Sequence, residues 1–440
     1  MKALSTNRRD FLKRSAGAGI LICSSQTAFT YAANEKLNIG AIGVGGQGVR
    51  NVEMLSQENI VAISEVDTKR GEKHLKGFPQ AKHYTDFRRM LDEMEKEIDA
   101  VLVCTPDHTH AVAAVNAMKR GMHVYCEKPL TRTVHEARIM RQVAAQQKVA
   151  TQMGNQFSVS EGVRRATEWG QAGTAGPIEE AYLWVSNGDG PISRPTDTPA
   201  VPDHLDWDLW LGPAPERPYH PEYVPFKWRS RRDFGSGGLG DMGCHTGNFL
   251  FRVLDLGKLW EPSPDAPSIK IEGEAVGVNL EGYPQAMKVH FHIPARGELP
   301  PVKLTVSSGV AMRPPKELLH GEKQEAFGSL LIGSKASIYS SNPWNTTSML
   351  LPKGSGVEEP EKTLPRGVNH HREWIDACKG QGDTFSPFSI GGPLTELIQL
   401  TSIAGITGET FHYHPLTGEI PDSEKASAML HRTYREGWSL

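Results

Sequence analysis

Short apolar runs alternate with amphipathic stretches along the first third of the chain. The apolar runs have the length of strands, whereas the stretches between them repeat apolar residues every three to four positions, as helices do. Strand patterns cover residues 37–42, 60–64, 99–105, 122–126 and 149–152, and helix patterns cover residues 49–55, 111–118 and 133–147. Strands that alternate with helices predict an α/β domain with a parallel, doubly wound sheet.

The pattern changes in the second half of the chain. Residues 287–293 and 302–306 alternate strictly between apolar and polar, and residues 330–339 read as a hairpin that turns near Gly333. Strict alternation is typical of half-buried strands. Residues 187–235 are rich in Pro, Gly, Trp and Arg without a clear period, which predicts a long ordered loop region that shapes a pocket. The second half therefore predicts a separate α+β domain.

The chain length fits two domains that follow a short leader. At 440 residues the chain is too long for one compact core, and we expect domains at residues 35–154 and 155–440. Hydrophobic residues make up 38% and charged residues 22%, as in soluble globular proteins. Without the first 33 residues the chain has 43 basic and 50 acidic residues. This balance predicts no nucleic-acid partner and no attraction to anionic lipid.

The first 33 residues resemble a bacterial twin-arginine export signal. The pair Arg8-Arg9 precedes an apolar stretch at residues 16–22 and small residues at 28–33. The apolar stretch is too short and too rich in Gly and Ala to be a stable membrane span. We expect cleavage near Ala33 and a periplasmic location. This route exports proteins already folded, often with a cofactor bound.

A glycine-rich turn follows the first predicted strand. Gly43, Gly45 and Gly48 form a GxGxxG pattern, with Gly46 and Gln47 inside it. The pattern lies between a strand and a helix, as dinucleotide binding requires. The first glycine allows the tight turn, the second lets the backbone approach a pyrophosphate, and the third lets the helix pack on the strand. The turn predicts a Rossmann domain whose bound phosphates lie at a helix N-terminus.

An acidic residue ends the second predicted strand. Glu65 lies 22 positions after Gly43, close to the ~20 expected for the acid that binds the adenosine ribose. A carboxylate at this position repels a 2′-phosphate, so the sequence favours NAD over NADP. Asp67 is the second candidate for this role.

The other strand ends supply further candidate contacts, because ligands bind at the carboxyl ends of the strands in open parallel sheets. We expect Asn155 to line a substrate pocket. We expect cofactor contacts from the residues at the remaining ends: Thr105, Pro106, His108, Glu127, Lys128 and Gln156. For His108 and the nearby His110, structural roles are the alternative.

Several motifs occur in a fixed order along the chain. Glu127-Lys128-Pro129 follows a short strand, and a glycine-rich segment at residues 237–245 places Asp241 and His245 four positions apart. With the glycine turn, these motifs resemble the Gfo/Idh/MocA family, which contains glucose-fructose oxidoreductase and inositol dehydrogenase. Further stretches match an exported bacterial branch of that family: residues 207–213, 225–229, 233–235, 369–372 and 434–438. The resemblance is firm over residues 36–250 and looser beyond.

The resemblance implies a fold and a chemistry. It implies an open, mostly antiparallel second sheet that supports a homodimer or homotetramer, and hydride transfer between NAD and a carbohydrate. Lys128 then lies beside the nicotinamide, and His245 serves as general acid–base because its ordinary pKa of ~6.5 lies near working pH. Asp241, on the same helix face, orients the imidazole or holds a substrate hydroxyl. The family often has a further Asp three residues after the histidine, where this chain has Asn248.

Other candidates lie further along the chain. We expect the substrate to contact Lys227, Trp228 and Arg229, with the indole stacked on a sugar face. His370 and His371 open a predicted helix and are candidates to reach the site. The sequence contains no HExxH motif and no Cys/His cluster, so it predicts no metal.

Three functions fit these features. The first is an NAD-dependent oxidoreductase that acts on a secondary hydroxyl of a sugar, polyol or sugar derivative and holds NAD tightly. The second is a redox-neutral glycoside hydrolase or lyase that forms a transient 3-keto sugar, which suits a compartment without a free nicotinamide pool. The third is a non-catalytic sugar-binding protein, against which the intact Lys128 and His245 argue.

Overall fold

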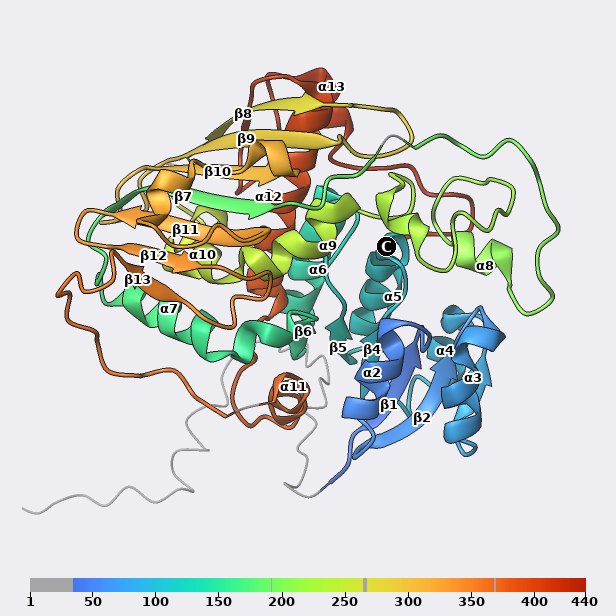
Figure 1. Ribbon diagram of the computed structural model, residues 1–440. Coiled ribbons are helices and arrows are strands. Elements are labelled where there is room, and N and C mark those ends of the chain that lie inside the picture. Colours follow the sequence, from blue (N-terminus) through green and yellow to red (C-terminus); the bar gives the residue numbers. More distant parts are fainter. Residues whose placement is uncertain (1–34, 191, 264–266, 368) are drawn as a thin grey trace, which may run out of the picture.

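Two β-sheets with their helices make up the protein (Figure 1). The computed structural model describes residues 35–190, 192–263, 267–367 and 369–440. The predicted export signal at residues 1–33 lies outside the described residues. The N-terminal domain occupies the lower right of Figure 1, and the larger second sheet lies beside it.

The first sheet has six strands in the order β3-β2-β1-β4-β5-β6, and all its neighbouring strands run parallel. Its strands are β1 (Asn38–Ile42), β2 (Asn59–Ser64), β3 (Lys82–Tyr84), β4 (Ala100–Val103), β5 (His123–Cys126) and β6 (Thr151–Met153). Its helices are α2 (Gln47–Met54), α3 (Thr68–Gly77), α4 (Phe87–Glu93), α5 (Asp107–Lys119) and α6 (Val134–Gln147). This order is that of the doubly wound Rossmann fold, so the predicted α/β architecture is confirmed.

Local sequence explains where these elements begin and end. Every residue of β4 is buried, as expected for a strand covered by helices on both faces. The predicted strand at residues 99–105 is shorter in the structure because Pro106 takes the N-cap position of α5. A reciprocal capping box between Thr133 and Glu136 starts α6. Residues 65–98, where we predicted no element, form α3, β3 and α4.

The second sheet has eight strands in the order β13-β12-β11-β7-β10-β9-β8-β14. Only β7 and β10 pair in parallel among these neighbours. The strands are β7 (Ile178–Val185), β8 (Ile269–Val276), β9 (Ala286–Ile293), β10 (Val302–Ser308), β11 (Phe327–Gly333), β12 (Ser337–Ser340), β13 (Met349–Leu351) and β14 (Phe411–Tyr413). The alternating segments form β9 and β10, and the predicted hairpin is β11 with β12. The mostly antiparallel sheet is therefore confirmed.

In the described part of the chain, seven α-helices follow the Rossmann domain in sequence (Figure 1). They are α7 (Glu161–Gln171), α8 (Trp207–Leu211), α9 (Gly237–Thr246), α10 (Asn248–Val253), α11 (His370–Cys378), α12 (Phe388–Thr407) and α13 (Glu424–Ala428). Of these, α9, α10 and α12 contact strands of the second sheet. The long α12 contacts α6 of the first domain, α9, and strands β8 and β9. As a result, one hydrophobic core runs through both domains. Among the described residues, no helix has the length and apolar character needed to cross a membrane.

The described part of residues 187–235 is an ordered loop region with its own small core. Trp207 stacks on Trp210 with ring centroids 4.7 Å apart, and both pack in a cluster with Tyr223, Trp228 and Phe234. The loop region is attached to the Rossmann domain at the start of α3, because the backbone N–H of Thr68 donates to the backbone carbonyl of His204 at 2.9 Å. The predicted long ordered loop is thus present, and its aromatic residues hold it in place.

Helix α11 follows the second sheet in sequence but packs on the first. Trp374, Ile375 and Cys378 join a cluster with residues of β1, β2 and β4. Arg164 of α7 donates to Glu373 of α11 at 2.9 Å, and both side chains are almost fully buried. The helix therefore completes the Rossmann core with residues from the C-terminal part of the chain.

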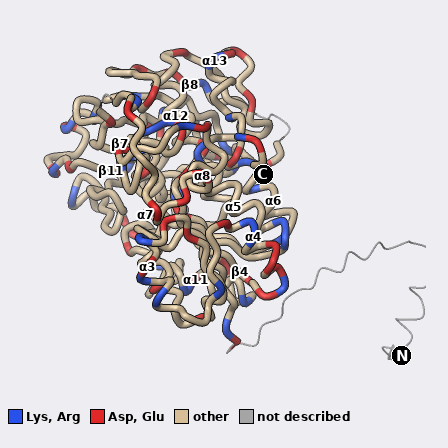
Figure 2. Tube along the Cα trace, turned by 90° about the vertical axis from the view of Figure 1, so that its right-hand side faces the viewer, with Lys and Arg blue, Asp and Glu red and all other residues tan. Residues whose placement is uncertain are grey.

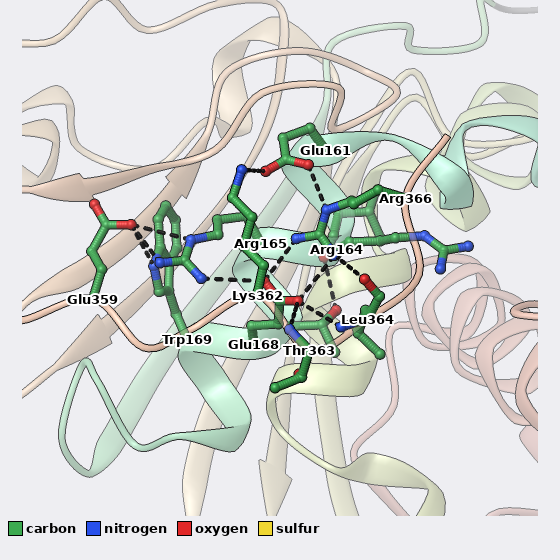
Figure 3. A network of polar contacts seen from close by, with 12 residues as sticks. Glu161, Arg164, Arg165, Glu168, Trp169, Glu359, Lys362, Thr363, Leu364 and Arg366 are labelled. Carbon is green, nitrogen blue, oxygen red and sulfur yellow. Dashed lines mark hydrogen bonds and ion pairs between the residues drawn. The ribbon is translucent and has the colours of Figure 1, made fainter. Parts of the chain in front are cut away.

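A polar network on α7 fixes the chain that leads into α11 (Figure 3). Glu168 accepts hydrogen bonds of 2.8 Å from the backbone N–H groups of Thr363 and Leu364, and Arg366 donates to the same carboxylate. Burial alone raises the pKa of Glu168, but these hydrogen bonds outweigh it and lower the pKa to about 2. An ionised Glu168 thus holds the approach to α11.

Figure 2 colours the Cα trace by charge, and positions of Lys and Arg are interspersed with positions of Asp and Glu in this view. Lys and Arg do not gather over one element in this view, and acidic residues lie among them on α3 and α4.

We expect Trp374→Ala to lower the free energy of unfolding by about 3–5 kcal/mol, because it leaves a large cavity in the Rossmann core. Urea denaturation followed by circular dichroism measures this loss. Arg372→Ala, on the exposed side of α11, is the matched control and should change stability by under about 1 kcal/mol. Equal stability of the Trp374 variant and the wild type would contradict a core role for α11.

Candidate active site

A cavity of about 670 Å³ lies at the carboxyl edge of the Rossmann sheet, a size usual for ligand sites. Its walls come from the glycine turn, the strand ends, the 187–235 loop region and α9. Most of the predicted site residues line it: Gly43, Gly45, Gly46, Gln47, Glu65, Thr105, Pro106, Glu127, Lys128, Gln156, Trp228, Arg229, Asp241 and His245. Tertiary folding thus brings the candidates of both domains to one cavity.

The glycine turn forms a cradle at the start of α2. Gly43 and Gly46 have φ values of 78° and 56°, a conformation that favours glycine. A Cβ on Gly43 would lie 2.9 Å from the carbonyl of Cys104, and one on Gly48 would collide with the carbonyl oxygen of Gly43. Gly48 therefore serves close packing, as expected, and does not itself line the cavity.

Glu65 holds this turn. One carboxylate oxygen accepts the backbone N–H groups of Val44 and Gly45 at 2.9 and 3.0 Å, and the other accepts that of Asp67 at 2.9 Å. Burial raises the pKa of Glu65, although these three hydrogen bonds oppose the shift. A carboxylate has about four acceptor sites, so one is left for a ribose hydroxyl. Asp67, the second candidate, caps α3 by accepting from the backbone N–H of Arg70.

Arg70 is a cavity residue that the sequence reasoning missed. It lies in the first turn of α3 and faces the glycine turn, since a Cβ on Gly46 would lie 3.0 Å from its guanidinium. A guanidinium beside a cradle of backbone N–H groups suits a phosphate. Its position five residues after Glu65, in the first turn of the following helix, was the available signal.

The residues of the cradle fit NAD. Thr105 lines the cavity, and its buried hydroxyl has no hydrogen-bond partner among the described residues. The glycine turn leaves room where side chains would collide, and Glu65 keeps an acceptor site. Among the residues that the structure describes, no three His, Cys, Asp or Glu side chains lie together as a metal site would require.

Lys128 and Asp241 join the two domains inside the cavity. Lys128 follows β5, and its ammonium donates to the Asp241 carboxylate at 2.7 Å and to the Asp241 backbone carbonyl at 2.8 Å. Arg229 lies 3.5 Å from the same carboxylate. Burial alone raises the pKa of Asp241, but the Lys128 charge and hydrogen bond outweigh it, so the pKa lies below its ordinary value. Asp241 is therefore ionised at neutral pH.

His245 differs from the expectation in two respects. Asp241 and His245 share α9, but the carboxylate bonds to Lys128 and Arg229 rather than to the imidazole. Burial, with the nearby Lys128 charge, lowers the pKa of His245 to about 3, far from the ~6.5 on which the prediction relied. The imidazole is thus neutral at working pH, and no described residue hydrogen-bonds to its ring.

Glu127 is the centre of a buried polar network behind the cavity. It accepts from Asn51 of α2 at 2.7 Å and from Gln156 at 2.6 Å. Asn51 in turn lies 3.1 Å from the ring nitrogen of His371, and His371 stacks on Tyr125 with centroids 5.1 Å apart. Helix α11 therefore reaches the cofactor side through His371. Sequence reasoning named His371 but missed Asn51.

His370 takes a structural position beside this network. Its Nε2 lies 3.1 Å from the backbone carbonyl of Met153, and its Nδ1 lies 3.2 Å from Ser158. Burial lowers the pKa of His370 well below its ordinary value. The ring thus fixes α11 against the end of β6 and does not reach the cavity.

Three predicted contacts lie away from the cavity wall. His108 is fully buried, with its ring nitrogens 3.2 and 2.9 Å from the carbonyls of Phe234 and Trp210. Asn155 donates to the carbonyl of Cys244 at 3.0 Å. The side chain of Lys227 is 70% exposed and faces Glu222. His108 and Asn155 bond to backbone carbonyls and Lys227 faces solvent, so none of the three side chains faces the cavity. This corrects their expected contacts with cofactor or substrate.

His110, by contrast, lines the cavity. Its ring nitrogens lie 2.9 Å from the carbonyl of Pro129 and 2.8 Å from that of Thr105. It therefore ties together the ends of β4 and β5, the two strand ends that present Thr105 and Lys128 to the cavity.

The fold and the cavity define the class: a two-domain protein whose Rossmann cradle faces a Lys–Asp–His cluster. Residues 37–155 match the family model described as "Oxidoreductase family, NAD-binding Rossmann fold", and residues 181–257 match "Oxidoreductase family, C-terminal alpha/beta domain". Both models are those of Gfo/Idh/MocA proteins. Two segments of the chain, which together make up less than half of it, are thus similar to the NAD-binding and C-terminal domains of this oxidoreductase family.

Named relatives are similar over part of their length. Inositol 2-dehydrogenase 4 of Saccharopolyspora erythraea is 32% identical over 103 residues, which cover 22% of this chain and 30% of the relative. A glycosyl hydrolase family 109 protein of Solibacter usitatus is 32% identical over 151 residues, 30% of this chain and 34% of the relative. The matched stretch therefore spans about a third of these curated relatives.

Solved structures support the fold over most of the chain. The WlbA dehydrogenase of Bordetella pertussis, in complex with NADH and UDP-GlcNAcA, superposes with a TM-score of 0.59 at 13% identity. The superposition covers 86% of this chain and 98% of that one. The Rossmann sheet and the second sheet together thus form a known two-domain architecture.

Asn51→Ala and His371→Phe should each weaken NAD binding about tenfold, because each breaks the hydrogen-bonded link from α11 to Glu127. Phenylalanine keeps a ring that can stack on Tyr125. Calorimetric titration of nucleotide-free protein with NAD measures the affinity. His292→Phe, at an exposed site on β9, is the control, and an unchanged Kd in the His371 variant would refute the coupling.

Proposed function

We propose that this protein is an NAD-dependent oxidoreductase that oxidises a secondary hydroxyl of a sugar, polyol or sugar derivative and holds its NAD tightly. The observation that carries the proposal is the placement of Lys128, Asp241 and His245 on the wall of the cavity that contains the glycine turn. The hydroxyl group of a substrate in that cavity lies within reach of the charged Lys128 and Asp241 and of the neutral His245.

Lys128 and His245 have different roles in the oxidation of a carbinol. When bound, NAD accepts the hydride from the carbinol carbon. The ammonium of Lys128, held by Asp241, donates a hydrogen bond to the substrate oxygen and stabilises its developing negative charge. His245 is neutral because its pKa is lowered to about 3, which leaves one ring nitrogen unprotonated. A ring with so low a pKa is a weak base, so it accepts the hydroxyl proton as the hydride leaves and not before. The step balances: the carbinol becomes a carbonyl, its hydride passes to NAD, and its hydroxyl proton passes to His245.

A redox-neutral reaction is the second candidate. Similarity to the glycosyl hydrolase family 109 protein favours it, and so does the export expected from Arg8 and Arg9. Transient oxidation at C3 of a sugar would acidify the C2 proton, which allows elimination of the anomeric group. Addition of water and re-reduction then give net hydrolysis of a glycoside. The Lys128–Asp241 pair and His245 serve this sequence with the same proton transfers.

A sugar-binding protein without activity is the third candidate. Binding alone needs neither an ion pair between the domains nor an unpaired imidazole in the cavity, and buried charges are costly to maintain. The retained Lys128, Asp241 and His245 therefore support a catalyst.

Protein purified by chromatography should release NAD(H) on denaturation, and a sugar substrate should change the nicotinamide absorbance at 340 nm. Lys128→Met and His245→Ala should each lower kcat/KM by about 10²-fold or more while nucleotide remains bound. Lys227→Met, which alters an exposed lysine outside the cavity, is the control. Full activity of both site variants would refute the assignment.

Two other outcomes separate the candidate functions. Loss of NAD on simple dialysis would contradict the tightly held cofactor. Release of nitrophenol from an aryl glycoside without added acceptor would replace net oxidation by the redox-neutral reaction. Binding of sugars without any turnover would leave only the non-catalytic candidate.

We also propose that the chain is exported by the twin-arginine route and acts in the periplasm. Replacing both Arg8 and Arg9 by Lys should retain the protein in the cytoplasmic fraction, because the paired arginines are the feature that the export machinery reads. Immunoblots of fractionated cells measure this, with Lys2→Arg as the control. N-terminal sequencing of the wild-type periplasmic protein should begin near residue 34, and export of the double variant would contradict the proposal.

A further inference from the structure

Two exposed aromatic rings lie at the cavity. Among the described residues, eight large apolar side chains are exposed, and the two aromatic ones are Phe226, at 64%, and Trp344, at 42%. Both line the cavity, whereas the six exposed aliphatic side chains do not. A single exposed apolar residue needs no explanation, but two exposed rings on the wall of one cavity mark a surface for a ligand.

The loop between β12 and β13 places Trp344 on the cavity wall that also contains His245. Asn345 is fully buried, has a φ of 52°, and donates to the backbone carbonyls of His245 and Thr246 at 2.9 Å each. The Trp344 ring packs on Phe157 with centroids 5.2 Å apart, and Phe157 lies edge-on to His245 at 6.3 Å. Trp344 therefore lies one aromatic ring further from the reactive centre than Phe157.

Phe226 is held by a neighbouring side chain of the 187–235 loop region. The Arg229 guanidinium lies over the rings of Phe226 and Trp228, 4.2 and 4.4 Å from their centroids. Arg229 is also 3.5 Å from the carboxylate of Asp241. Phe226, like Trp344, is thus connected to the reactive centre through one intervening side chain.

We propose that Trp344 and Phe226 form a second ring subsite next to the reactive centre. The substrate class is then a glycoside whose oxidised sugar carries another ring, either a second pyranose or an aromatic aglycone. A sugar whose carbinol meets Lys128 and His245 occupies the space beside Phe157, and the next ring along reaches Trp344. Pyranose C–H faces and aromatic rings share a flat apolar surface that packs on indole and phenyl rings.

This inference rests on the proposed function, because it assigns the sugar itself to the Lys128 end of the cavity. It adds a preference for substrates that carry a second ring, which Lys128, Asp241 and His245 by themselves would not give. Free monosaccharides and linear polyols leave both exposed rings in water, whereas a ring-bearing glycoside covers them. The same preference holds for net oxidation and for the redox-neutral reaction.

The test compares matched methyl and phenyl glycosides of glucose, galactose and N-acetylglucosamine, α and β, on the NAD-loaded protein. For the sugar that is accepted, the wild type should prefer the phenyl glycoside by about tenfold in kcat/KM. Trp344→Ala and Phe226→Ala should each reduce that ratio several-fold, and the double variant should bring it close to one. Val276→Ala, an exposed apolar residue outside the cavity, should leave the ratio at its wild-type value.

The outcomes distinguish this inference from the proposed function. Turnover of methyl and phenyl glycosides at equal rates by the wild type would overturn the ring subsite and leave the oxidoreductase intact. A phenyl preference that survives the double variant would do the same. If NAD binds but neither the glycosides nor free sugars are turned over, both the subsite and the proposed function are wrong.

Discussion

The ion pair between Lys128 and Asp241 is the interaction on which the site depends. Lys128 follows strand β5 of the Rossmann sheet, Asp241 lies on helix α9 of the second domain, and their side chains meet at 2.7 Å. Partly buried ion pairs give little net stability, because desolvation offsets the attraction between the charges. The pair instead fixes one domain against the other at the cavity. It also keeps Asp241 ionised and, through the Lys128 charge, helps to keep His245 neutral.

A second set of buried polar contacts links the cofactor side to the C-terminal part of the chain. Arg164 and the Glu168 network hold α11 in place, and α11 brings His371 to Asn51, which bonds to Glu127. Buried polar groups of this kind need partners, since an unpaired one costs about 1–3 kcal/mol. The position of the glycine turn therefore depends on residues more than 300 positions away.

The cavity also combines rigid and exposed surfaces in a way that bears on substrate choice. The polar part of its wall, with Lys128, Asp241 and His245, is buried or partly buried, whereas the apolar rings of Phe226 and Trp344 are exposed. The polar part suits hydroxyl groups and the apolar part suits a flat ring.

The sequence by itself determined the features that depend on neighbouring residues. The alternation of strands and helices, the glycine turn, Glu65 at a strand end and the spacing of Asp241 and His245 were all readable, because secondary-structure period and turn chemistry are local. Tertiary structure decided which of these side chains face the cavity. His108, Asn155 and Lys227 point elsewhere because backbone carbonyls or solvent hold them. Arg70 and Trp344 line the cavity, and Asn51 acts from behind it through Glu127. Their roles arise from contacts between distant segments and from burial, which shifts the pKa of His245 to about 3 and which no local pattern encodes.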